Sequence, residues 1–393
     1  GRRPARRIEV RTVASDAGSR MFDDDLLDDP GRLEAIDSGG LLRAAATAGA
    51  QVRSTATAAR EAGLDRLSGQ RPRALVLLTR PGAVPAAAPL LVALLGSACP
   101  VPVVTARSVP MWVGALDVVL ASTTDPGDPE LAEGIDRAVR RGAQVVLTAP
   151  ADGPVAAAAA GRSVMLVPRI DVPFGLALPR TLAAGLLLLD TLGLLPADPE
   201  VLAGELDHEV ERDHIGHESF VNPAKSLALR LAERVPLLWG TDPVATAVAG
   251  HAAGALAAHA GVVAHAAGFH EAAVLPALWQ EVTRAEERSE VFHDPFEDPA
   301  SGRELRPVLL GVQSEQQLER SAAMRAVPGA DVVTADEELM GRPGEPGALA
   351  CSAAVLALRF DLAALYLGLG RGVLGGPGWG GSRESTGSAS AFG

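Results

Sequence analysis

The sequence predicts an α/β protein made of two successive units, each with a parallel sheet flanked by helices. Short, unbroken apolar runs such as ALVLL (74–78) alternate with longer Ala- and Leu-rich segments of helical composition. Continuous apolar strands separated by helices are typical of parallel sheets that are covered on both faces. The alternation breaks near 196–220 and starts again at VPLLWG (235–240), so we expect one sheet in each half.

The elements of the two units follow from the same pattern. In the first unit we expect strands at 74–78, 101–104, 116–121, 143–149 and 163–168, and helices at 86–97, 130–141 and 175–195. In the second we expect strands at 235–240, 261–266, 306–312 and 330–335, and helices at 205–212, 223–233, 243–259, 313–325 and 348–370. We therefore divide the chain into an N-terminal extension (1–20), a first domain (21–200), a second domain (201–374) and a Gly/Ser-rich disordered tail (375–393).

Composition excludes several classes of protein. The formal net charge of −13 and the absence of a basic patch argue against nucleic-acid binding. The longest apolar stretch, Ala83–Val104, contains four prolines, which argue against a membrane helix. Cys99 and Cys351 lie in apolar surroundings, as small core residues of a reducing compartment do. We expect a cytoplasmic protein without a membrane segment.

Three longer motifs carry a resemblance to a known family. DVVLASTTDPGDPEL (117–131) follows VPMWVGALDVVLAS, and NPAKSLALRLAERVPLLWG (222–240) opens the second unit, while RFDLAALYLGLGRG (359–372) closes it. Together they resemble the sugar isomerase (SIS) superfamily, specifically the two-domain bifunctional phosphoglucose/phosphomannose isomerases, over residues 21–375. The resemblance implies two SIS-type domains, a homodimer, and a sugar phosphate or related sugar derivative as ligand. We expect no cofactor and no metal.

The resemblance also assigns substrate-binding positions. The family holds the substrate phosphate with hydroxyls and with backbone N–H groups at helix N-termini. The matching positions in this sequence are Gly82, Ser122, Thr123, Glu130, Asn222 and Lys225. Asn222 with Pro223 next to it is also good helix-capping chemistry, so a purely structural role for Asn222 and Lys225 is the alternative.

Two aspartates disagree with a phosphate site. Asp125 and Asp128 replace a serine and a threonine of the second phosphate loop, and Ala83 replaces a serine of the first. Like charges about 4 Å apart repel by roughly 4 kcal/mol at an effective dielectric near 20. Asp before a helical run is also a common cap. We expect one of these aspartates to cap the following helix and a bare phosphate to bind weakly.

Most catalytic positions of the family are changed as well. His270, followed by Glu271, matches the catalytic histidine motif, and the alternative role for His270 is a domain contact. Ala258 stands in place of the catalytic glutamate, and Phe174 stands in place of the ring-handling arginine. Arg169 and Arg180 lie nearby in the sequence and could replace that arginine. The alternative is that they are an ordinary loop charge and an ordinary helix-start charge. The chain has no lysine after Lys225 to match the family's closing lysine.

Other chemistries find little support. His208, His214 and His217 lie among acidic residues, but Gly216 interrupts the helix that would align them as metal ligands. His251, His259 and His265 do not fall at ligand spacing. Two hypotheses remain: an aldose–ketose phosphate isomerase, or a catalytically inactive relative that acts as a sugar-derivative sensor or as a protein-interaction module.

Overall fold

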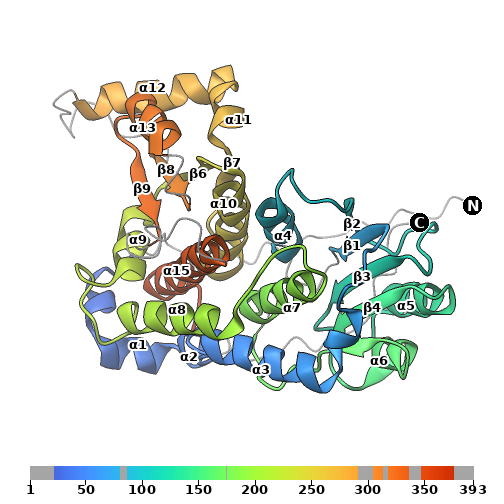
Figure 1. Cartoon of the computed structure of the whole chain (residues 1–393). Helices are drawn as coiled ribbons and strands as arrows, with labels where there is room; N and C mark the ends of the chain where they lie inside the picture. The colour runs from blue at the N-terminus through green and yellow to red at the C-terminus, as the bar shows by residue number, and fades with distance from the viewer. Residues whose placement is uncertain are drawn as a thin grey trace, which may run out of the picture.

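The computed structural model describes residues 22–79, 86–173, 175–290, 304–312, 317–335 and 347–375, and it contains two parallel sheets (Figure 1). The first has the order β2-β1-β3-β4-β5 and the second the order β7-β6-β8-β9. In both, the first strand of the unit lies inside the sheet, with the second strand on one side and the third on the other. This is the doubly wound arrangement, in which ligands bind at the carboxyl ends of the strands.

The strands agree closely with the predicted ones. The first sheet contains β1 (Ala74–Leu78), β2 (Val103–Ala106), β3 (Asp117–Ser122), β4 (Gln144–Thr148) and β5 (Val164–Met165), and the second contains β6 (Val235–Gly240), β7 (His265–Gly268), β8 (Leu305–Gly311) and β9 (Asp331–Thr334). Two strands differ clearly: β5 is only two residues long where 163–168 is predicted, and β7 is shifted from the predicted 261–266. Strand β7 starts later because the preceding helix runs on to Ala260 and Gly261 then takes a left-handed conformation (φ 59°).

The helices of the first unit cover both faces of its sheet. They are η1 (Asp25–Asp28), α1 (Pro30–Ile36), α2 (Leu41–Ala45), α3 (Ala48–Glu61), η2 (Leu64–Leu67), α4 (Ala87–Leu95), α5 (Pro129–Arg140), α6 (Gly153–Ala159) and α7 (Leu178–Thr191). Those of the second unit are α8 (Pro199–Arg212), α9 (Pro223–Leu231), α10 (Pro243–Ala255), the π-helix η3 (Leu256–Ala260), α11 (Phe269–Ala273), α12 (Pro276–Glu290), α13 (Gln317–Ala326) and α15 (Ala348–Gly370).

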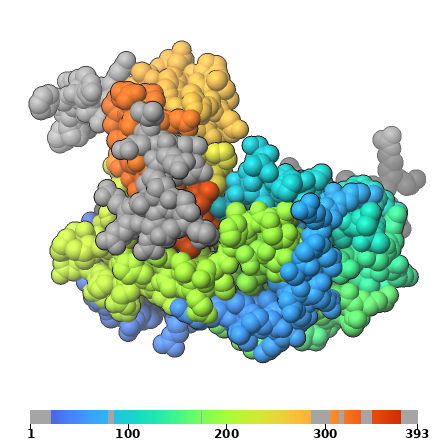
Figure 2. All heavy atoms as spheres, viewed as in Figure 1, coloured from blue at the N-terminus to red at the C-terminus, as the bar shows by residue number. Residues whose placement is uncertain are grey.

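One hydrophobic core joins the two sheets. Leu75 and Leu77 of β1 point into it, whereas Val76 and Leu78 point to a separate cluster under α5, because strand side chains alternate between faces. Leu238 of β6 enters the shared core from the second sheet. Figure 2 shows the outer helices of the second unit, coloured yellow and orange, projecting beyond the green and blue helices at the base.

Helix α15 lies in the centre of this core. Its length and mean hydropathy of 1.8 are sufficient for a membrane span, but 89% of that apolar window is buried inside the protein. Such burial is the behaviour of a core helix. Among the described residues, this is the one helix that passes the length and hydropathy test.

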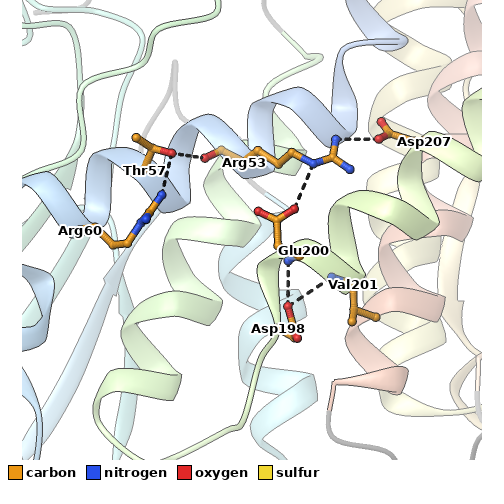
Figure 3. Close-up of polar contacts among 7 residues, drawn as sticks. All are labelled: Arg53, Thr57, Arg60, Asp198, Glu200, Val201 and Asp207. Carbon is orange, nitrogen blue, oxygen red and sulfur yellow. Dashed lines mark hydrogen bonds and ion pairs between the residues drawn. The ribbon is translucent and has the colours of Figure 1, made fainter.

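Helices α3 and α8 connect the predicted domains (Figure 3). Arg53 on α3 forms ion pairs with Glu200 (3.2 Å) and Asp207 (2.6 Å) on α8, whose first turn is capped by Asp198. These pairs are partly exposed, so their contribution to stability is small. A Cβ on Gly49 would lie 2.6 Å from the carbonyl oxygen of Ala203, so glycine permits the close approach of the two helices. The domain boundary near residue 200 therefore falls within a tightly packed region and stays a prediction.

Candidate functional site

The loop after β3 is held together by its own side chains. The Thr123 hydroxyl accepts a hydrogen bond from the backbone N–H of Asp125 (3.0 Å), and Asp125 accepts one from the N–H of Gly127 (2.8 Å). Asp128 caps α5 by accepting a hydrogen bond from the N–H of Leu131 (3.0 Å). The predicted capping role is confirmed for Asp128. Its carboxylate therefore accepts a hydrogen bond from an amide at the helix N-terminus, where a phosphate would otherwise bind.

Two more residues assigned to phosphate binding, Ser122 and Glu130, lie next to this loop. Ser122 is half-buried at the end of β3, with its hydroxyl oxygen 3.5 Å from that of Thr181 on α7. Glu130 is exposed on the first turn of α5. Gly82 lies outside the described residues, as does Phe174. Their roles in substrate binding stay predictions.

Asn222 and Lys225 are both completely buried and hold the backbone. The side chain of Asn222 accepts a hydrogen bond from the N–H of Lys225 (2.8 Å) and donates one to the carbonyl of His214 (3.1 Å). The Lys225 ammonium donates to the carbonyls of Ile215 (2.7 Å) and His217 (2.6 Å) and lies over the ring of Tyr366. Burial lowers the pKa of Lys225. Asn222 therefore caps α9 as predicted, and Lys225 fastens the loop between α8 and α9.

His270 and Glu271 lie at the exposed start of α11, directly after β7. The His270 ring packs edge-on against Phe269, with 5.6 Å between the ring centroids. The Glu271 carboxylate accepts a hydrogen bond from the N–H of Gly268 (3.2 Å) and so caps its own helix. A catalytic role for this pair stays a prediction.

Arg169 and Arg180, the arginines near the position where the family has its ring-handling arginine, form contacts with other parts of the first unit. Arg169 is exposed and forms an ion pair with Glu61. Arg180 is buried and donates to the carbonyl of Ile170 (3.1 Å), and burial lowers its pKa. The His214 and His217 rings lie edge to face, but within the described ranges no group of three His, Cys, Asp or Glu side chains is placed to hold a metal ion.

The largest cavity described lies between α4 and α10, which contact each other across the two units (Figure 1). Its volume is about 800 Å³, enough for a small-molecule ligand. Both helices follow the first strand of their sheet, so the cavity lies where the two units meet. Its described lining is formed by Ala86, Pro89, Val92, Ala93, Thr105, Gly175, Pro243, Thr246, Ala247, Gly250, His251, Gly254, Ala255, Ala258 and His259.

Two histidines lie in this lining, beside two threonines. His251 on α10 is buried, and its Nε2 lies 2.8 Å from the carboxylate of Asp361 on α15. Burial lowers the pKa of His251, but the Asp361 carboxylate outweighs that effect and leaves the pKa raised. His259 is also buried, and its pKa is lowered because burial outweighs the attraction of Asp361. The cavity wall therefore combines an imidazole that is paired with a carboxylate behind it and a second imidazole whose pKa is lowered.

Backbone geometry places His259 in this wall. His259 belongs to η3, and π-helical turns often occur at functional sites. Gly175 faces it with φ +95°, and a Cβ built on Gly175 would lie 2.9 Å from the His259 Nε2. Glycine is therefore required at this position for both conformation and space.

Sequence reasoning did not single out His251 and His259. They are eight residues apart, which places side chains about 80° apart around a regular α-helix. The π-helical turn adds one residue, so His259 returns towards the side of the helix that carries His251. Ala258, the position of the family's catalytic glutamate in the resemblance, also lines the cavity.

Comparison with known proteins agrees with this architecture. Residues 220–374 match the family described as the bacterial phospho-glucose isomerase C-terminal SIS domain. No curated protein matches the chain. All three solved structures named next are 10–12% identical in sequence, so their similarity concerns the fold.

The first of these is a hypothetical protein from Thermus thermophilus, with 12% identity, a TM-score of 0.60, and coverage of 88% of this chain and 89% of that one. The tagatose-6-phosphate ketose/aldose isomerase from Escherichia coli has 12% identity, a TM-score of 0.53, and coverage of 85% and 91%. The C-terminal domain of glucosamine-fructose-6-phosphate aminotransferase from Francisella tularensis has 10% identity, a TM-score of 0.54, and coverage of 86% and 98%. Two doubly wound parallel sheets and the match over residues 220–374 lead to one conclusion: the chain resembles the SIS superfamily in its fold, and its second unit matches the C-terminal SIS domain of the bacterial phosphoglucose isomerases.

Proposed function

We propose that this chain binds a sugar derivative in the cavity between α4 and α10 and does not interconvert aldose and ketose phosphates. The observation that carries the proposal is the lining of the cavity. Ala258 lies in the wall at the position that the resemblance gives to the catalytic glutamate. The described lining residues include neither a carboxylate nor a guanidinium.

The missing groups bear directly on isomerase chemistry. Loss of a general base typically lowers a rate by about 10²–10⁴-fold. Asp125 and Asp128 are engaged in their own loop, where they add negative charge beside the position of the substrate phosphate in the family. Both effects favour binding without turnover. The homodimer and the cytoplasmic location implied earlier are part of the same proposal.

Isomerase activity and binding are tested separately. We expect no turnover of glucose 6-phosphate or mannose 6-phosphate above the protein-free rate in a coupled assay. We expect ligand-induced thermal stabilisation by at least one sugar or sugar derivative from a panel that includes phosphorylated and neutral compounds. Turnover that is abolished by His270→Ala would refute the inactive relative and support the isomerase. Stabilisation by no member of the panel would contradict a sugar-binding role.

A further inference from the structure

One polar group of the cavity wall, His251, is held in place by a carboxylate behind it. The Nε2 of His251 forms a hydrogen bond with the carboxylate of Asp361 at 2.8 Å. Among the described residues, the Nδ1 of His251 has no hydrogen-bond partner. Because the carboxylate fixes the ring, the remaining nitrogen is held in a defined orientation, as in other carboxylate–histidine pairs. His251 is therefore oriented by Asp361 in the cavity wall.

His259 is a second polar group whose capacity for hydrogen bonding is not used. Only 6% of its surface is exposed, and its Nε2 has no partner in the part of the chain that the structure describes. Buried polar atoms are nearly always hydrogen-bonded, and an exception calls for a functional explanation. Glycine at position 175 leaves open the space next to this nitrogen.

Apart from Thr105 and Thr246, the rest of the described lining is apolar. Side chains of Ala, Pro and Val and bare glycine backbone form most of the surface. The Thr246 hydroxyl donates to the carbonyl of Asp242 (2.8 Å) within its own helix, so it is already engaged. A ligand that fits this surface presents hydroxyls to the histidines and an apolar group to the remaining wall.

Charge favours a neutral ligand. Among the described residues that line the cavity, none is a lysine or an arginine that would balance a phosphate dianion. The Asp361 carboxylate already has a hydrogen-bond partner in His251. An unpaired dianion would be costly to transfer from water into such surroundings.

We propose that His251, oriented by Asp361, and His259 bind the hydroxyls of a neutral glycoside whose apolar aglycone lies against the α4–α10 wall. This inference rests on the proposed function and adds the class of ligand and the residues that recognise it. Asp361 acts as a positioning residue in this arrangement, because it holds His251 through the Nε2 atom and leaves the Nδ1 atom for a ligand.

The test compares the affinities of three probes for the full chain by isothermal titration calorimetry. They are phenyl α-mannopyranoside, methyl α-mannopyranoside and mannose 6-phosphate, each repeated with the glucose compound. We expect the phenyl glycoside to bind at least about tenfold more tightly than the other two, because its ring removes additional apolar surface from water. His259→Leu should weaken that binding about tenfold or more. His208→Leu, an exposed histidine on α8, is the matched control and should leave it unchanged.

The outcomes separate the inference from the proposed function. If a sugar binds but His259→Leu behaves like His208→Leu, the assignment of His259 is wrong while sugar binding stands. Tighter binding of mannose 6-phosphate than of either glycoside would overturn the neutral class of ligand. If none of the probes or other sugars binds, both proposals fail. Because the Nε2 of His259 loses no hydrogen bond within the described protein, the His259→Leu variant is expected to fold, which circular dichroism verifies.

Discussion

Replacing Lys225 by methionine tests whether this residue acts on the backbone or on a substrate. The side chain is fully buried, and its ammonium donates hydrogen bonds to the carbonyls of Ile215 and His217 at 2.7 and 2.6 Å. Methionine retains the length of the side chain but cannot donate. Each buried carbonyl that loses its donor costs about 1–3 kcal/mol, and the variant no longer has to desolvate an ammonium.

Taking about 1.5 kcal/mol for each carbonyl, the free energy of unfolding falls by about 3 kcal/mol. The entropy of unfolding is about 2 cal/mol/K per residue, and the shared core indicates that the two predicted domains, residues 21–374, unfold together. The melting temperature should then fall by about 4 °C. Arg66→Met, which removes a positive charge at an exposed position, is the control and should change it by less than about 1 °C.

Differential scanning fluorimetry and chemical denaturation measure these changes. Sugar affinity is measured on the same variants at a temperature where all of them are folded. A Lys225→Met protein that melts like the wild type but no longer binds the sugar would refute the structural interpretation. That result would instead support the substrate-binding role that the resemblance implies for Lys225.

The same structure makes four further predictions. Asp128→Ala should lower the free energy of unfolding by about 1 kcal/mol, because α5 loses its cap. The double variant Asp125→Ser and Asp128→Thr should bind glucose 6-phosphate more tightly than the wild type. Unchanged affinity would contradict the electrostatic argument. Arg359→Met should cost about 3 kcal/mol in urea denaturation, because it removes the buried guanidinium from Glu209 and leaves that buried carboxylate with Arg212 at 3.4 Å; a loss below about 1 kcal/mol would show that the pair is dispensable. Burial and then the nearby Glu209 raise the pKa of Asp213, so the folded protein retains a proton that the unfolded chain releases, and stability should fall as the pH rises above about 4. Asp213→Asn should remove that slope from the pH dependence of unfolding, and an unchanged slope would place its origin elsewhere.

Much of the fold is encoded locally. The apolar strands and the helices between them are predicted by their composition, since a strand buried on both faces has few polar positions. The caps at Asp128 and Asn222 are also local, because each side chain bonds to an amide three residues further along the chain. Helix α8 starts at Pro199, earlier than the predicted 205, and Asp198 followed by Pro199 is a local signal for that start.

The candidate site depends on contacts that no local pattern contains. His251 and Asp361 are 110 residues apart in the sequence and meet only because α10 and α15 pack together in the shared core. His259 faces the same cavity because a π-helical turn changes the phase of the helix, and the periodicity of a regular helix gives no indication of that turn. The sequence by itself determined the two α/β units and the capped loop in place of an open phosphate cradle. The tertiary structure alone decided which polar groups share the cavity, because long-range packing and a local change of helix phase brought them together.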